Sequence, residues 1–425
     1  MKHLFSNRLR CAIFCVGSIA VIGGICVMAG DRGPTSEQIE AGHQLFLHEW
    51  TVDDPLSGEG DGLGPVFNET SCVACHFQGG TGGGGANQHN VLTFEVDPDR
   101  DRKEVVSHVV HASATSGQFQ ESLETVQDLF PIIPAGVRIV GGCSVRVSEH
   151  NPVSFQAVNS PALFGVGVLN EVSPWSVIKH NAKRFREKVS DELSGDYHHN
   201  GKGFARSHSG GRMGKFGWKG QFASVEEFVA AACAMELGLT NPSKSQPIPQ
   251  QHSEDPDAKL DMTQEQLDQL VAFVVSLPAP QQILPTDHDA RQRAVQGEKL
   301  FNQIRCNDCH VKDLGEAKGL YSDLQLYSLA RRDFGGNYFR EEIQFERPAG
   351  VPLAEHWKTP PLWGVADSAP YFHDGQSPTL EEAIQRHWGQ AKHSRSLYKA
   401  LSKDEQRMVV EFLGTLRAPQ LKSSL

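Results

Sequence analysis

The chain has 425 residues, 39% of them hydrophobic and 21% charged, which fits a folded protein of two or three domains. Its formal net charge of −11 at pH 7 argues against nucleic acid as a partner, because that polyanion is bound by basic surfaces. An acidic chain is compatible with a basic electron-donor protein, but many exported proteins are acidic without such a partner.

Residues 1–29 have the layout of a secretory signal peptide. Lys2, Arg8 and Arg10 precede an uncharged apolar run over residues 11–28, after which the sequence becomes polar. An uncleaved N-terminal membrane anchor is the alternative, because the run is near the lower limit for a membrane span. We therefore expect a periplasmic or otherwise exported protein, whose charge becomes −14 (−11 minus 3) if the segment is removed.

Two Cys-x-x-Cys-His motifs carry the strongest chemical signal. In such a motif the thiols add to the vinyl groups of a haem, and the adjacent histidine reaches the iron. A zinc site or a redox dithiol is the alternative for a single copy. Two copies in one chain predict two covalently bound c-type haems, with each histidine as the proximal iron ligand. The residues are Cys72, Cys75 and His76 in the first motif and Cys306, Cys309 and His310 in the second.

The remaining cysteines divide into two groups. Cys11, Cys15 and Cys26 lie within the signal segment. Cys143 and Cys233 are left over, and they could pair in an oxidising compartment, although the sequence does not show whether they are close.

Several segments recur in the same order in both halves. Gly-His-Gln-Leu-Phe at 42–46 returns as Gly-Glu-Lys-Leu-Phe at 297–301, residues 159–166 return as 358–365, and residues 263–277 match 402–416. Preserved order indicates a duplicated unit. We predict a mainly α fold with two cytochrome c-like haem domains, at 36–280 and 287–425, separated by a linker over 278–287.

Helices are predicted at four Ser/Thr-x-x-Glu/Gln capping boxes, which begin at Ser224, Thr263, Thr379 and Ser402. The first domain has extra material after its haem motif. Within it, residues 91–96, 105–110 and 137–147 suggest short strands, so we expect a small β-containing insertion. A glycine-rich loop at 79–85 lacks the Lys-Ser/Thr of a phosphate loop, and it favours close backbone approach to a porphyrin face.

The second half resembles bacterial di-haem cytochrome c peroxidases. The matching segments are Lys-Thr-Pro-Pro-Leu-Trp-Gly at 358–364, Ala-Pro-Tyr-Phe-His-Asp-Gly at 369–375 and Thr-Leu-Glu-Glu-Ala at 379–383. The pattern extends to the di-haem enzymes that finish tryptophan-derived quinone cofactors. Residues 61–68, 217–221 and 236–241 are more similar to the di-haem oxidoreductases, a branch described as thiol oxidoreductases or peroxidases. The resemblance covers most of the mature chain.

The resemblance implies two unequal haems. The C-terminal haem would store and relay electrons, and in the peroxidases a methionine fourteen residues after the His-Asp-Gly histidine ligates its iron. Here that position is His387, and a bis-histidine iron has a lower potential than a His/Met iron. A surface role for His387, or ligation by the nearby His393, is the alternative.

The N-terminal haem would be the reactive one, with an open or displaceable sixth site. The family uses a glutamate as acid–base group, and Glu236 is the matching residue, two positions nearer than in the peroxidases. Phe228 stands where the family has a helper glutamine. His89 and His150 are candidate sixth ligands in a resting state.

Trp218 matches the family's tryptophan between the haems, a route for electrons, and core packing is the alternative. The family also holds a calcium through an asparagine and two backbone carbonyls, which by position are Asn159, Ser368 and Pro370. The resemblance thus implies a redox enzyme with Glu236 and Trp218 as catalytic residues. It would take electrons from a donor protein, a small cytochrome or copper protein, and reduce an oxidant such as hydrogen peroxide. A non-catalytic electron carrier and a thiol or side-chain oxidoreductase are the alternatives.

Overall fold

The computed structural model describes residues 33–96, 106–115, 128–132, 134–140, 143–147, 151–193, 201–248, 253–329 and 355–420, with positions 117, 126 and 149. The predicted signal segment at 1–29 and the candidate ligand His150 lie outside these residues. Residues Pro34–Leu425 form one compact unit. Among the described residues, no helix has the length and apolarity needed to cross a membrane.

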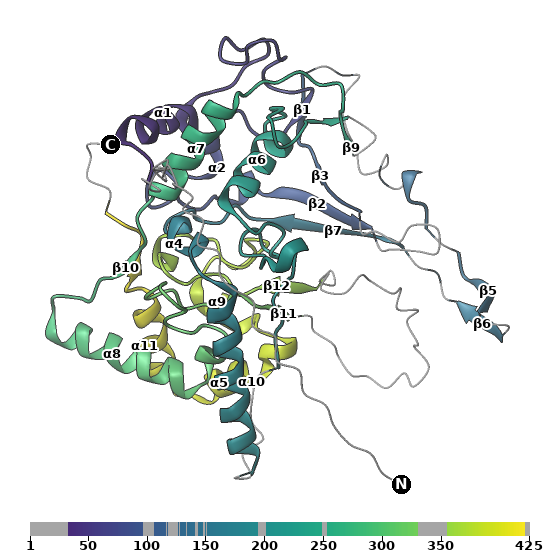
Figure 1. The fold of residues 1–425 in the computed structure, drawn as a ribbon. Coiled ribbons are helices and arrows are strands. Elements are labelled where there is room, and N and C mark those ends of the chain that lie inside the picture. The colour runs from purple at the N-terminus through teal and green to yellow at the C-terminus, as the bar shows by residue number, and fades with distance from the viewer. Residues whose placement is uncertain are drawn as a thin grey trace, which may run out of the picture. The chain divides into compact units, whose positions relative to one another are not determined.

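The fold is mainly helical, as predicted, with small strands between the helices (Figure 1). The helices are α1 (Ser36–Leu47), α2 (Cys72–Cys75), α4 (Val166–Asn170), α5 (Pro174–Leu193), α6 (Val225–Glu236), α7 (Gln264–Ser276), α8 (His288–Gln303), α9 (Leu380–Gln385), α10 (Lys392–Ala400) and α11 (Lys403–Leu413). The strands are β1 (Val66–Phe67), β2 (Val91–Val96), β3 (Val106–Val110), β4 (Ser113–Ala114), β5 (Gly136–Val140), β6 (Cys143–Val147), β7 (Val153–Val158), β8 (Pro247–Ile248), β9 (Ser253–Glu254), β10 (Gln281–Gln282), β11 (Leu326–Ser328), β12 (His356–Lys358) and β13 (Leu416–Arg417).

All four predicted capping residues open helices. Thr263 and Ser402 form complete capping boxes at α7 and α11. Ser224 accepts a hydrogen bond from the backbone N–H of Glu227 at the start of α6, but the Glu227 carboxylate accepts from Ala223 rather than from Ser224. The sequence signal therefore located each helix start, while the return half of the box depends on the local path of the chain.

The insertion contains a three-stranded antiparallel sheet with the order β3-β2-β7. Strands β2 and β3 lie where the sequence predicts them. The segment predicted at 137–147 is divided into a hairpin of β5 and β6, and β7 was not predicted. Burial on this sheet is concentrated at Phe94, Val96, Val110 and Val153, which form a small core of their own.

Two helix pairs pack in the same way, α1 against α7 and α8 against α11 (Figure 1). A Cβ on Gly42 of α1 would lie 1.8 Å from the carbonyl oxygen of Gln269, and one on Gly297 of α8 would lie 1.9 Å from that of Met408. Glycine at these positions lets the helix backbones approach closely. The repeated Gly-x-x-Leu-Phe segments therefore have the same packing role in both pairs.

The larger hydrophobic core extends across the predicted domain boundary. It is built mainly from the first half, and it also includes Leu314, Leu320 and Trp363 of the second. A smaller core surrounds Phe301, Tyr398 and Phe412. The predicted linker at 278–287 includes β10, which pairs with β13 near the C-terminus.

Candidate functional site

The two Cys-x-x-Cys-His motifs have closely similar backbone geometry. The backbone N–H of His76 donates to the carbonyl of Cys72 at 3.1 Å, and that of His310 donates to Cys306 at 2.9 Å. Each motif therefore winds through one helical turn and places its two cysteines and its histidine together. The four thiols are free: Cys72, Cys75, Cys306 and Cys309.

Both motif histidines are held in the form that binds a metal. The Nδ1 atom of His76 lies 3.1 Å from the carbonyl oxygen of Gly83, and that of His310 lies 2.9 Å from the carbonyl oxygen of Tyr321. With Nδ1–H donating to a carbonyl, Nε2 remains as the ligand atom. Burial lowers the pKa of each histidine to about 4, so both imidazoles are neutral at pH 7.

A phenylalanine ring packs near each of the two histidines at almost the same distance. The rings of Phe46 and His76 have their centres 6.3 Å apart, and those of Phe301 and His310 are 6.4 Å apart. Both phenylalanines end a repeated Gly-x-x-Leu-Phe segment. The glycine-rich loop at 79–85 also contacts the first histidine, because the carbonyl oxygen of Gly83 accepts the hydrogen bond that orients His76.

A second imidazole faces His310. The ring centre of His387 lies 6.3 Å from that of His310, and the Nδ1 atom of His387 is 2.8 Å from the carbonyl oxygen of Ala383. A metal–imidazole bond is about 2.0–2.1 Å, and with roughly 1.2 Å from nitrogen to ring centre, two axial imidazoles on one metal have centres about 6.4 Å apart. The observed spacing fits a single iron between the two rings.

A cavity of about 280 Å³ adjoins this pair of imidazoles. Its wall includes both cysteines of the second motif, Trp218 and Phe228 from the first half, and residues of the Pro-Tyr-Phe-His segment. Cavity, paired cysteines and two neutral imidazoles are the features that a bis-histidine c-type haem requires, so the residues fit that group.

The first motif has a carboxylic acid beside it. Glu236, at the end of α6, is partly buried, and burial raises its pKa while the hydrogen bond from Asn68 and the charge of His111 lower it by less. The Nδ2 atom of Asn68 donates to the carboxylate of Glu236 at 2.5 Å, and the backbone carbonyl of Glu236 accepts from the N–H of Asn68 at 2.8 Å. The charge of Glu236 contributes to the raised pKa of the Cys75 thiol. The raised pKa favours the protonated form of Glu236 more than in an ordinary glutamate.

Cys233 lies one turn before Glu236 and is a free, buried thiol whose pKa is raised by burial. The side chain of Cys143 lies outside the described residues. Phe228, on the same helix, packs against Phe216 and Phe222 with ring centres 6.1 and 5.7 Å away. This position therefore serves apolar packing.

His89 is close to the first motif. Its Nδ1 atom lies 2.5 Å from a carboxylate oxygen of Glu69, and both groups are within 4.8 Å of the sulfur of Cys75. The other candidate resting ligand, His150, lies outside the described residues.

Trp218 lies in the cavity wall between residues of the two halves. Its indole N–H donates to the carbonyl of Asn159 at 2.8 Å, and its ring stands edge-on to His373 with centres 6.4 Å apart. His373 stacks on Trp357 at 3.5 Å. Aromatic rings therefore form a continuous wall on this side of the cavity.

The three residues predicted to bind calcium also line this cavity: Asn159, Ser368 and Pro370. The side-chain amide nitrogen of Asn159 donates to the carbonyl of Gly85 and to Asn90, at 2.9 and 2.8 Å. Nearby, Gln78 donates to the carbonyl of Ala369 at 2.5 Å, and its own Oε1 is buried with no hydrogen-bond partner among the described residues. The Oε1 atom of Gln78 is thus a buried oxygen available as an acceptor close to these residues.

Comparison with known proteins identifies the family of the chain. The family model described as "Di-haem oxidoreductase, putative peroxidase" matches residues 149–416, well over half of the chain. The chain belongs to the di-haem oxidoreductase family. The resemblance seen in the sequence is thereby confirmed.

Individual relatives of this di-haem oxidoreductase are distant. The gamma subunit of hydrazine synthase from Kuenenia stuttgartiensis is 27% identical over 142 residues, covering 28% of this chain and 40% of that one. The match thus spans less than half of that relative. Among solved structures, hydrazine synthase from the same organism has 16% identity and a TM-score of 0.33, over 61% of this chain and 73% of that one. The diheme peroxidase BthA of Burkholderia thailandensis has 14% identity and a TM-score of 0.39, over 92% and 89%. A MauG-like protein associated with microbial copper homeostasis has 18% identity and a TM-score of 0.30, over 49% and 71%.

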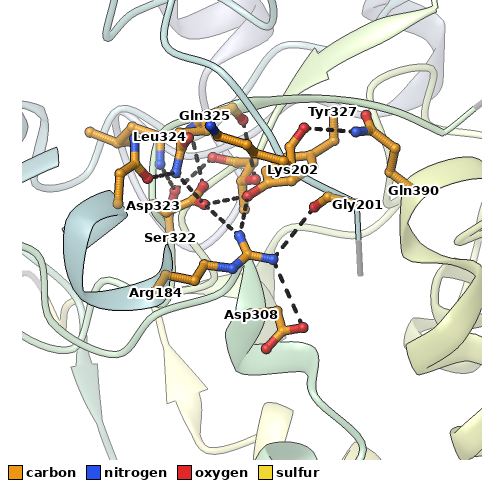
Figure 2. Close-up of polar contacts among 12 residues, drawn as sticks. Arg184, Gly201, Lys202, Asp308, Ser322, Asp323, Leu324, Gln325, Tyr327 and Gln390 are labelled. Atoms are coloured by element: carbon orange, nitrogen blue, oxygen red, sulfur yellow. Dashed lines mark hydrogen bonds and ion pairs between the residues drawn. The ribbon is translucent and has the colours of Figure 1, made fainter. Parts of the chain in front are cut away.

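The di-haem oxidoreductase also contains a polar cluster that sequence reasoning missed (Figure 2). Arg184 of α5 donates to the hydroxyl of Tyr327 at 2.7 Å, and that hydroxyl donates to Asp323 at 2.6 Å. Burial raises the pKa of Asp323 to about 6, although its hydrogen bonds lower it. Arg184 lies 3.9 Å from Asp308, which is between the two cysteines of the second motif. The acidic Asp308 within the second motif was the one sequence signal that pointed to this cluster.

Proposed function

We propose that this di-haem oxidoreductase is an exported enzyme of two cytochrome c-like units that passes electrons from its C-terminal haem to its N-terminal haem and there reduces hydrogen peroxide. The difference between the two sites carries this proposal. The second motif has a second imidazole at a spacing that fits one iron, whereas the first has a partly buried carboxylic acid beside it.

The second motif would hold its haem through Cys306 and Cys309, with His310 and His387 on the iron. Carbonyl groups orient both imidazoles, and burial keeps them neutral, so neither has to lose a proton or turn before binding. Two strong nitrogen ligands and no open position suit a relay of electrons.

The first motif would hold its haem through Cys72, Cys75 and His76. With haem bound, iron here would supply the redox chemistry that takes peroxide, two electrons and two protons to two water molecules. Glu236 supplies what the protein must add. It accepts a proton from one peroxide oxygen and returns it to the other, and its raised pKa makes it a better proton acceptor than an ordinary glutamate.

Trp218 is the proposed electron route between the halves. Its hydrogen bond to Asn159 fixes the indole in the cavity wall, and its edge-on contact with His373 leads toward Phe372, whose ring centre is 5.3 Å from that of His387. These contacts join Trp218 to a proposed ligand of the C-terminal haem.

Calcium is proposed at Asn159, Ser368 and Pro370, supported by their common place in the cavity wall and by the buried Oε1 atom of Gln78. Metal analysis of the purified protein tests this. One calcium in the wild type and none in Asn159→Ala is expected, and equal content in both would contradict the assignment.

The decisive experiment is the spectrum of the oxidised protein with both haems. We expect one high-spin and one low-spin haem, and turnover of peroxide with a reduced small cytochrome or copper protein as donor. Two fully low-spin haems that do not respond to peroxide would overturn the proposal.

A non-catalytic electron carrier is the second candidate, and the packing of Phe228 favours it, because no amide from that position assists Glu236. A carrier would exchange electrons with the donor and show no peroxide turnover. Cys233 gives no support to thiol oxidation, because burial raises the pKa of this thiol above its ordinary value.

A further inference from the structure

Helix α5 exposes apolar side chains along one face. Trp175, Ile178, Phe185 and Val189 are 67%, 51%, 63% and 37% exposed, and the exposed Ala182 lies in the middle of the row. The spacing of three and four residues puts these positions on one face of the helix. We call these five residues the α5 row.

The opposite face of α5 is polar and is fixed to the second half of the chain. Arg184 donates to Tyr327 at 2.7 Å (Figure 2), and Asn181 accepts from Gln325 at 2.8 Å. Val177 is also buried on this side. Helix α5 therefore packs on the protein with polar side chains and exposes apolar side chains to solvent, the reverse of the usual amphipathic arrangement. Exposed apolar rows of this kind mark interaction surfaces.

Basic residues border the α5 row. Lys179, Lys183 and Arg186 are all exposed and lie along one edge of it. Lys183 pairs with Glu187 at 3.8 Å, while the chain as a whole has a net charge of −11. The edge is thus a local positive strip on an acidic protein. Its charge fits an acidic partner and disfavours a second copy packed antiparallel, which would bring Lys179 toward Arg186.

The anchor of α5 leads directly to the second haem motif. Arg184 lies 3.9 Å from Asp308, the residue just before Cys309, and Tyr327 lines the same cavity as Cys309. A protein bound on the α5 row would therefore be separated from the second haem motif by one helix, about 10–12 Å in diameter.

We propose that the α5 row is the docking surface for the electron donor, a small redox protein whose contact face has an apolar patch bordered by carboxylates. This inference rests on the proposed function only in that electrons enter at the C-terminal haem. Apolar contact would hold the complex and the basic edge would steer it, so binding should weaken as salt rises. A small interface suits a donor that must leave after each electron.

The test is a stopped-flow measurement of one electron passing from a reduced blue-copper protein with an acidic contact face to the oxidised full-length protein with both haems. Peroxide is omitted. The comparison probe is the same copper protein with its contact carboxylates changed to amides. We expect Lys179→Glu with Lys183→Glu, and separately Phe185→Ser, to slow the reaction at low salt about tenfold or more. Lys299→Glu, an exposed lysine on α8, is the matched control and should leave the rate unchanged.

Reduction by ascorbate with a small mediator should be equal in all variants, and direct binding by calorimetry should weaken in parallel with the rates. Wild-type protein that reacts no faster with the acidic probe than with the amide probe would overturn the proposal, as would unchanged rates in the variants. So would three other results. A lowered melting temperature of Phe185→Ser would show that the row is covered by another part of the chain. A change of mass in sedimentation when the row is changed would show that a second copy binds there. If the variants lose binding to vesicles of 30% phosphatidylglycerol in phosphatidylcholine and keep binding to the copper protein, the row binds a lipid surface. Because no peroxide is used, this test can succeed when peroxide turnover fails, and the reverse.

Discussion

The two haem motifs are alike on one side and different on the other. In each, a carbonyl orients the proximal histidine and a phenylalanine packs 6.3 or 6.4 Å from its ring. Across from His310 stands His387, whereas the acid Glu236 lies beside the first motif. One supporting framework thus has two different sets of neighbours, a second imidazole at the second motif and a carboxylic acid at the first.

The largest effect on the difference between the two sites is expected from removing the carboxylic acid of Glu236. Glu236→Gln should lower the rate of peroxide reduction by about 10²–10⁴-fold, because it keeps the shape and loses the proton transfer. Glu226→Gln, an exposed position on the same helix, is the control and should be neutral. Steady-state kinetics with a reduced cytochrome give the answer. Equal loss of both haem signals instead would indicate a structural role for Glu236.

The same variant makes a prediction about pH. Burial raises the pKa of Glu236, so its carboxylate form, which accepts the peroxide proton, grows as pH rises through a value above that of an ordinary glutamate. Wild-type activity should therefore increase with pH across that range. Glu236→Gln should lack this rise, and a rise that persists in the variant would assign it to another group.

Next in size is the opposing imidazole of the second site. His387→Met should keep that haem low-spin and raise its midpoint potential by roughly 0.1–0.3 V, because a thioether stabilises the reduced iron. Spectroelectrochemical titration measures the potential of each haem separately. His393→Met is the matched control, since His393 is the competing candidate in the sequence, and a shift there with none at His387 would exchange the two roles.

The shared framework is tested by two alanines. Gly42→Ala and Gly297→Ala each place a Cβ within 1.9 Å of a carbonyl oxygen of the paired helix, so each should destabilise the fold by about 1–3 kcal/mol. Gly136→Ala, where a Cβ meets nothing within 4 Å, is the control. Urea unfolding gives the comparison. A large effect at one glycine only would show that the two helix pairs are not equivalent.

The positions of the two haem motifs and of the helix starts could be predicted from the sequence, because each depends on a short contiguous motif. Cys72 to His76 and the capping residues Thr263 and Ser402 need no distant partner to be recognised. Contacts between distant segments gave no such signal. Asn68 meets Glu236 across 168 positions, and Arg184 meets Tyr327 across 143, so neither pairing can be read from spacing.

Helix α5 shows a second kind of limit. Its apolar positions have helical spacing, and a sequence pattern of that kind normally marks the buried face. The structure buries the other face, because Arg184 and Asn181 find charged and polar partners near the second motif. Which face of a helix is buried depends on its neighbours, and the pattern alone does not contain them.

The smallest expected effect concerns the hydrogen bond that holds the acid in place. Asn68 donates to Glu236, while its own side-chain oxygen accepts from the backbone N–H of Ala112 at 2.9 Å, so its amide is fixed at both ends. This hydrogen bond lowers the pKa of Glu236. Asn68→Ala should therefore raise that pKa further, move the rise of activity to higher pH and reduce the rate about tenfold at neutral pH.

Asn302→Ala, an exposed asparagine on α8, is the matched control for this variant. The haem spectrum should be unchanged in both, which separates a positioning role from damage to the fold. Asn68→Asp sharpens the test, because a second carboxylate at the same place should move the pH rise further than alanine does. If the rise of activity with pH is the same in the Asn68 variants as in the wild type, Asn68 does not replace the helper glutamine that the family has at the position of Phe228. Glu236 would then transfer the proton without help from Asn68.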